Sequence, residues 1–204
     1  MFPPDAPEVV RAVCQAVEAS PVVQSVMLGG SRAEGRATEL SDWDLYLAGE
    51  PDTLMAEIPE LVAPLRPLAS FWEPLSEHAG YMTVMDGPVK IDLFPEGGRR
   101  ELQPPWEPRP DTLAGIDGHF WDWLLWLGSK SLRHETGMVA QELAKMQWFL
   151  LGPLGVEQAP GSLDEAVAVY LTARREASRR FGTSVAGELR RQVIGALRRY
   201  RLVS

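Results

Sequence analysis

The pattern of apolar positions changes near the middle of the chain. In the first half, short alternating or wholly apolar runs predict strands, and stretches of helical period lie among them. The predicted strands are residues 22–28, 43–47, 81–85 and 89–94, and the predicted helices are residues 7–19, a short helix capped by Ser31, and residues 52–63. In the second half the period is helical throughout, and the predicted helices are residues 117–135, 138–151, 163–181 and 184–201.

A proline-rich segment separates the two halves. Residues 95–111 contain five prolines, which interrupt helices and strands alike. The pattern therefore predicts an α+β chain with a small mixed-sheet domain over residues 1–100, a linker over 101–112 and an α-helical bundle over 113–204.

The composition is that of an ordinary globular protein. Of the 204 residues, 45% are hydrophobic and 24% are charged, which excludes a disordered or coiled-coil chain. No apolar run approaches the roughly 20 residues of a membrane span, and no signal-peptide pattern is present, so we expect no membrane partner. The single cysteine, Cys14, cannot form an internal disulfide, and we expect a cytoplasmic location.

Charge is distributed unevenly along the chain. Residues 1–112 carry 8 basic against 19 acidic residues, a net of −11, whereas residues 113–204 carry 12 against 9, a net of +3. The overall charge of −8 argues against a DNA or RNA partner and favours a small, cationic or polyhydroxylated one. The paired arginines of the predicted helices indicate a solvated helix face, with a phosphate or RNA patch as the alternative. They are Arg174, Arg175, Arg179, Arg180, Arg190, Arg191, Arg198 and Arg199.

Two acidic residues begin the second predicted strand. The sequence Leu28-Gly29-Gly30-Ser31 is followed, after ten residues, by Asp42-Trp43-Asp44-Leu45. Side chains alternate along a strand, so Asp42 and Asp44 share one face while Trp43 and Leu45 enter the core. Adjacent carboxylates repel one another, and their pairing beside a glycine turn indicates a divalent cation.

A third acid and the glycine turn extend this candidate site. In the last predicted strand of the first half, Lys90 and Asp92 share a face, and Asp92 completes a three-carboxylate cluster if that strand neighbours the first pair. Gly29 and Gly30 would allow a phosphate to approach the backbone, and Ser31 would offer donors to it. The alternative is a glycine turn followed by a solvated acidic hairpin.

Over residues 22–95 the chain resembles the DNA polymerase β-like nucleotidyltransferase superfamily. The family motif is an apolar residue, Gly, then Gly or Ser, a spacer of similar length, Asp-apolar-Asp/Glu-apolar, and a third Asp on a later strand. The matching positions are Leu28, Gly30, Ser31, Asp42, Trp43, Asp44, Leu45 and Asp92. The resemblance implies transfer of a nucleoside monophosphate from ATP or another nucleoside triphosphate, with the three aspartates as catalytic residues and ligands of two Mg²⁺ ions.

The same resemblance implies a nucleotide-binding role for the turn. The residues concerned are Gly29, Gly30, Ser31 and Arg32. The chain departs from the pattern at Glu34, where relatives often carry a basic residue. Arg32 or Arg36 would then supply the missing positive charge; the alternative is a poor affinity for the triphosphate.

A nucleotidyltransferase core followed by a helical bundle is similar in layout to the aminoglycoside and lincosamide adenylyltransferases. The stretch from His119 to Glu135 resembles their first bundle helix. This implies that the bundle binds substrate, that Lys130 contacts the triphosphate, and that Glu135 acts as a base or binds a substrate amine. An exposed helix lysine and a surface glutamate are the alternatives.

Three functions follow from these observations. The first is an enzyme that moves AMP from ATP onto a hydroxyl of a small molecule. The second is an AMPylating, antitoxin-type nucleotidyltransferase, although minimal antitoxins have the size of the first domain alone. The third is a non-catalytic partner-binding module, against which the intact aspartates argue.

Overall fold

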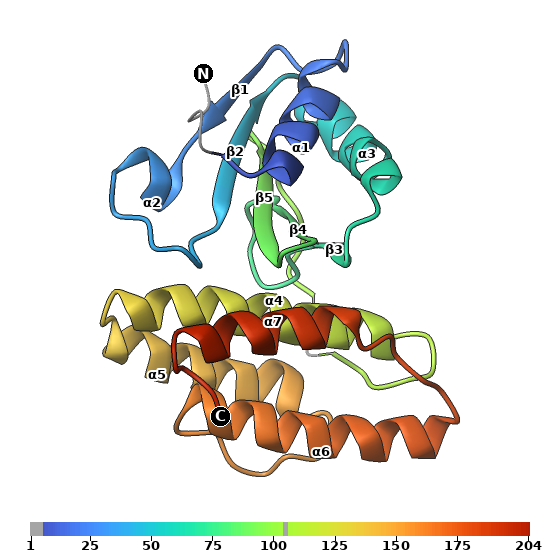
Figure 1. Cartoon of the computed structure of the whole chain (residues 1–204). Coiled ribbons are helices and arrows are strands. Elements are labelled where there is room, and N and C mark those ends of the chain that lie inside the picture. The colour runs from blue at the N-terminus through green and yellow to red at the C-terminus, as the bar shows by residue number, and fades with distance from the viewer. Residues whose placement is uncertain (1–5, 104–105) are drawn as a thin grey trace. The chain divides into compact units, whose positions relative to one another are not determined.

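The structure is a computed structural model that describes residues 6–103 and 106–204. The predicted α+β class is confirmed, because a five-stranded mixed sheet lies in the first part and helices alone form the second. The chain divides into two compact units, Met1–Gln103 and Pro104–Ser204 (Figure 1). Among the described residues, none of the helices has the length and apolarity that crossing a membrane requires.

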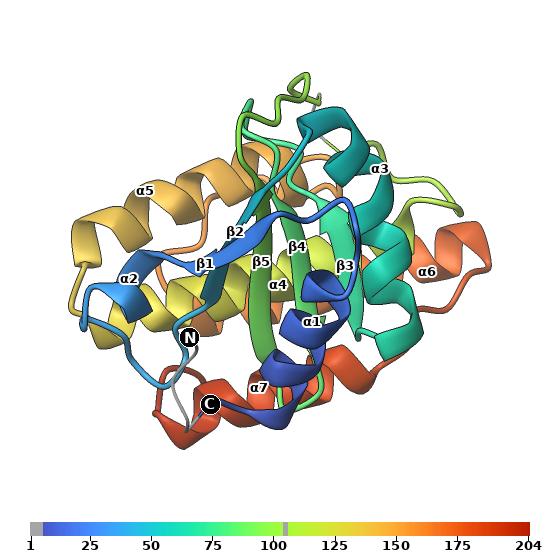
Figure 2. The ribbon, with the colours of Figure 1, turned by 90° about the horizontal axis from the view of Figure 1, so that it is seen from above.

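The sheet of the first unit is mixed, in the order β1-β2-β5-β4-β3 (Figure 2). Its strands are β1 Ser25–Leu28, β2 Trp43–Ala48, β3 Ala69–Trp72, β4 Tyr81–Met85 and β5 Val89–Pro95. The central β2 and β5 are parallel, and every other pair is antiparallel. A parallel pair cannot be joined by a tight turn, so residues 49–88 carry the chain from the end of one strand to the start of the other.

Helices cover one face of this sheet. They are α1 Glu8–Glu18 and α3 Pro51–Val62, which continues into the short 3₁₀ turn η1 Ala63–Leu65. Both lie on the same side of the strands (Figures 1 and 2) and share one apolar cluster with them. Trp43 and Leu45 belong to this core, 5% and 0% exposed, which confirms their predicted orientation. Cys14 of α1 is buried there too, and burial raises the pKa of its thiol to about 12.

Three details of the first unit differ from the sequence prediction. Strand β3 was not predicted, since its four residues are too few to show a clear alternation; it is defined by pairing with β4. Strand β1 begins at Ser25 rather than at residue 22. The prediction that Ser31 caps a helix is wrong: α2 spans Gly30–Ala33 with Gly29 at its cap, because a positive φ of 59° at Gly30 turns the chain one residue earlier.

The second unit is built around one buried helix. Helix α4 is apolar on almost every side and contacts the other three helices. The helices are α4 Leu113–Leu132, α5 Thr136–Met146, α6 Leu163–Phe181 and α7 Glu188–Arg199, and the π-helical turn η2 Gln147–Leu151 extends α5. The four predicted helices are thus present; α4 begins four residues before its predicted start, and the predicted helix 138–151 consists of α5 and the π turn.

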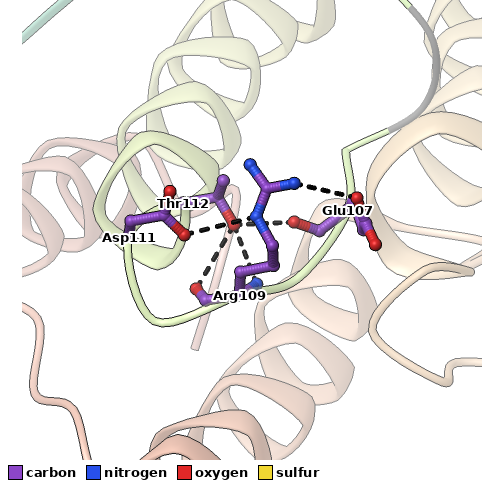
Figure 3. A network of polar contacts seen from close by, with 4 residues as sticks. All are labelled: Glu107, Arg109, Asp111 and Thr112. Atoms are coloured by element: carbon purple, nitrogen blue, oxygen red, sulfur yellow. Dashed lines mark hydrogen bonds and ion pairs between the residues drawn. The ribbon is translucent and has the colours of Figure 1, made fainter.

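An ordered turn leads into α4 from within the predicted linker (Figure 3). The Thr112 hydroxyl donates to the Glu107 carbonyl (2.7 Å) and accepts from the Arg109 N–H (2.9 Å). The Arg109 guanidinium in turn reaches the carboxylates of Glu107 (2.9 Å) and Asp111 (3.3 Å). These ion pairs are exposed and add little stability, so the threonine hydrogen bonds define the turn.

A buried polar group joins α4 to α6. The Tyr170 hydroxyl donates to Asp117 Oδ1 at 2.8 Å, and Arg174 Nε lies 2.7 Å from the same oxygen. Arg174 also donates to the Val185 carbonyl after α6 (2.9 Å). Burial raises the pKa of Asp117, and the Arg174 charge acts against that rise. The ion pair therefore compensates a charge that the core would otherwise disfavour.

We expect Arg174→Ala to destabilise the second unit by about 3–5 kcal/mol, because it leaves the Asp117 carboxylate buried without its cation. The measurement is urea unfolding followed by tryptophan fluorescence. Arg175→Ala is the matched control, since this neighbouring arginine is exposed, and it should change stability by no more than about 0.5 kcal/mol. Equal effects of the two substitutions would contradict a stabilising role for the ion pair.

Candidate active site

The pairing of β2 with β5 brings the three predicted aspartates together. Asp44 lies opposite Asp92 in the parallel register, as Trp43 lies opposite Ile91. Alternation places Asp44 and Asp92 on the sheet face away from the core, and Asp42 joins them from just before β2. One carboxylate oxygen from each residue lies within 4.8 Å of the others.

The glycine turn packs directly against this cluster. The Gly29 N–H donates to the Asp44 carbonyl at 2.8 Å, which holds the turn against β2. A Cβ on Gly30 would lie 1.7 Å from Asp44 Oδ2, and a Cβ on Gly29 would lie 2.3 Å from the Tyr46 ring. A side chain at either glycine would therefore require Asp44 or Tyr46 to shift, independently of any phosphate.

Arg32 fixes the chain at the start of β2. Its Nε donates to the Asp42 carbonyl at 2.9 Å, and its NH2 donates to the Ser41 carbonyl. The guanidinium also lies over the Trp43 ring, 4.1 Å from the centroid. These contacts make Arg32 a positioning residue for Asp42; its predicted contact with a nucleotide stays a prediction. Arg36, the other candidate cation, pairs with exposed Glu34.

Lys90 is the site residue that sequence reasoning missed. Its ammonium donates to Asp92 Oδ1 at 2.7 Å and lies 3.4 Å from Met82 Sδ, with only 4% of the side chain exposed. The signal was its position two residues before Asp92 on the same strand, which predicted a shared face but not a bond. A lysine this deeply buried requires a charged partner, and Asp92 is one.

The negative charge of the cluster affects the neighbouring Tyr46. It follows Asp44 on the same face of β2 and stacks on Phe94, with ring centroids 5.1 Å apart. Burial raises the pKa of the Tyr46 hydroxyl, and the negative charges of Asp44, Asp42 and Asp92 raise it further. The site therefore disfavours any additional anion unless a cation accompanies it.

The residues present fit a divalent cation. Carboxylate oxygens are hard ligands of the kind that Mg²⁺ prefers, and Asp42 and Asp92 are buried. Beside them, Ser31 Oγ is buried and has no hydrogen-bond partner, which is unusual for a hydroxyl in a folded protein. A polar ligand would satisfy this hydroxyl as well as the charge of the cluster.

The two candidates in the second unit have local partners. Lys130 Nζ lies over the Trp126 ring, 4.5 Å from its centroid. Glu135 Oε1 accepts from Arg133 Nε at 2.6 Å. The roles of Lys130 toward a triphosphate and of Glu135 toward a substrate stay predictions.

Comparison with known proteins gives likenesses among solved structures only. No protein-family profile and no curated protein matches the chain. Among solved structures, the chain is similar to an aminoglycoside 6-adenyltransferase from Bacillus subtilis, with 11% sequence identity and a TM-score of 0.31 over 93% of this chain and 95% of that one. At these values the likeness establishes neither a shared family nor an activity.

We expect Gly30→Ala to destabilise the first unit more than Gly35→Ala does. Both positions have a positive φ, 59° and 68°, which costs a non-glycine residue about 1–2 kcal/mol. Only at Gly30 does a Cβ meet Asp44, and relieving that overlap should cost a further 1–3 kcal/mol or so. Urea unfolding of both variants measures the difference. Equal losses would show that the close approach of Asp44 is not needed for stability.

Proposed function

We propose that this protein is a Mg²⁺-dependent nucleotidyltransferase that moves a nucleoside monophosphate, AMP from ATP, onto a hydroxyl of a small molecule. The observation that carries the proposal is the meeting of three carboxylate oxygens within 4.8 Å, two of them from paired parallel strands and one from the residue before β2, beside a glycine turn. The resemblance of these same positions to the nucleotidyltransferase motif supports it.

The three aspartates are assigned distinct roles. Asp42 and Asp44 would hold two Mg²⁺ ions, and Asp92 would share one of them. Bound there, Mg²⁺ would offset the charge of the triphosphate and lower the pKa of the acceptor hydroxyl. Asp92 accepts the proton of that hydroxyl while the hydroxyl oxygen forms a bond to the α-phosphorus. The bond from the α-phosphorus to the bridging oxygen breaks, and pyrophosphate leaves.

The glycine turn is assigned to the triphosphate. The Ser31 hydroxyl, buried and without a partner, is available to donate to a phosphate oxygen. Gly29 and Gly30 present backbone without side chains at the same place. Arg32 steadies the Asp42 backbone and adds positive charge at the turn. We assign Lys130 to the triphosphate as well, and Glu135 to the acceptor.

A pyrophosphate-release screen tests the whole proposal. Each nucleoside triphosphate is combined with aminoglycosides, lincosamides and other hydroxyl compounds, with cationic and polyhydroxylated acceptors favoured because residues 1–112 carry a net charge of −11. Turnover on a small molecule supports the proposal. Modification of a co-purifying protein alone would favour the antitoxin-type enzyme, and absence of nucleotide binding would favour a partner-binding module.

We expect ATP to bind in the presence of Mg²⁺ and hardly at all in EDTA. The reason is electrostatic, because a bare triphosphate would approach Asp42, Asp44 and Asp92 without a cation between them. Isothermal titration calorimetry in the two buffers makes the comparison. Equal affinities would refute the idea that a metal ion bridges protein and nucleotide.

Without ligand, we expect Asp42→Asn to have the same free energy of unfolding as the wild type or one that is higher by up to about 1–2 kcal/mol. The reason is that the substitution removes one of three repelling charges. The Arg32 contact would survive, because it uses the main-chain carbonyl. Mg-ATP should stabilise the wild type by roughly 2.7 kcal/mol at a hundredfold excess over the dissociation constant, and this variant far less.

Thermal melts with and without Mg-ATP measure both effects. Asp52→Asn is the control, since it removes an exposed acid of the same unit at the start of α3, and it should keep the response to Mg-ATP. An Asp42→Asn variant that is less stable in EDTA yet still stabilised by Mg-ATP would show that Asp42 is a structural residue.

A further inference from the structure

A positively charged side chain, Lys90, lies against the cluster of three carboxylates. The register pairs Asp44 with Asp92 and Trp43 with Ile91, and Asp42 and Lys90 are the residues directly before that second pair. Asp44 of β2, Asp42 just before it, and Lys90 and Asp92 of β5 form a group of four side chains, which is called the square below. Three of its corners are carboxylates and the fourth is a lysine.

The lysine is directed at one carboxylate of the square. Its Nζ lies 2.7 Å from Asp92 Oδ1, a charge-assisted hydrogen bond in which 4% of the lysine side chain and 6% of the aspartate side chain are exposed. Little water is present to screen the pair. A divalent ion bound through Asp92 would therefore lie close to the ammonium and be repelled by it.

The charges of the square match a single divalent ion. Three carboxylates and one ammonium carry a net charge of −2 when all are ionised, which one divalent cation balances. A second such ion would leave the square with an excess of positive charge, unless an anionic ligand arrived with it.

We propose that Lys90 is the resident cation of this cluster: it holds Asp92 in place of a second divalent ion, so that the nucleotide-free protein takes up one divalent ion instead of two. The inference rests on the proposed metal-dependent function and adds to it a residue that limits metal loading. Lys90 acts through Asp92 and is thus a positioning residue.

The test is a Mn²⁺ titration of the nucleotide-free protein, with free Mn²⁺ measured by electron paramagnetic resonance. Wild type and Lys90→Arg, which keeps the charge, should bind one equivalent. Lys90→Met, which removes the charge and keeps the length, should bind two. One equivalent in Lys90→Met, or two in the wild type, would overturn the inference while leaving the proposed function intact.

A double variant tests whether the second ion binds through Asp92. Lys90→Met combined with Asp92→Asn should return to one equivalent, because the released ligand is removed; two equivalents would overturn the assignment to Asp92. Lys90→Gln, which keeps a donor for Asp92, replaces Lys90→Met if circular dichroism shows the latter to be unfolded, and should also bind two. If neither the wild type nor any folded variant binds Mn²⁺ without nucleotide, this inference is overturned, whereas the proposed function is decided separately by the binding of Mg-ATP.

Discussion

The parallel pairing of β2 with β5 is the constraint on which the first unit depends. It aligns two strands of the same alternation, so that Leu45 and Leu93 face the helices while Asp44 and Asp92 face the other way. A slip of one residue would turn a carboxylate of β5 into the apolar core and a leucine of β5 away from it. The apolar contacts under the sheet therefore fix the positions of the acids above it, although no apolar side chain belongs to the site.

The same face shows how a cluster of like charges is tolerated in a folded protein. The glycine turn allows Asp44 to lie against backbone, Arg32 ties down the chain at Asp42, and Lys90 pairs with Asp92. Each acid is thus positioned by a different device. Arrangements that gather repelling groups are expected to lower stability in return for function. Here Arg32 and Lys90 bring positive charge to the cluster.

The sequence allowed the local part of this arrangement to be predicted. Alternation placed Asp42 and Asp44 on one face and Asp92 on the outer face of its own strand, but the adjacency of β2 and β5 depends on strand order, which no local pattern encodes. Strand β3 was not predicted because its pairing with β4, and no local pattern, defines it. Ser31 was misplaced as a cap because the turn depends on the positive φ of Gly30. The buried bond of Lys90 required knowing what surrounds β5.

Cys14 gives the first unit an internal probe. It is the chain's single cysteine, it lies in the core that α1 and α3 share with the sheet, and burial holds its thiol in the protonated, unreactive form. An alkylating reagent can therefore modify it only after that core opens, at a rate set by the opening equilibrium. Because the second unit has no cysteine, the labelling rate measures the opening of the first unit separately from any unfolding of the second.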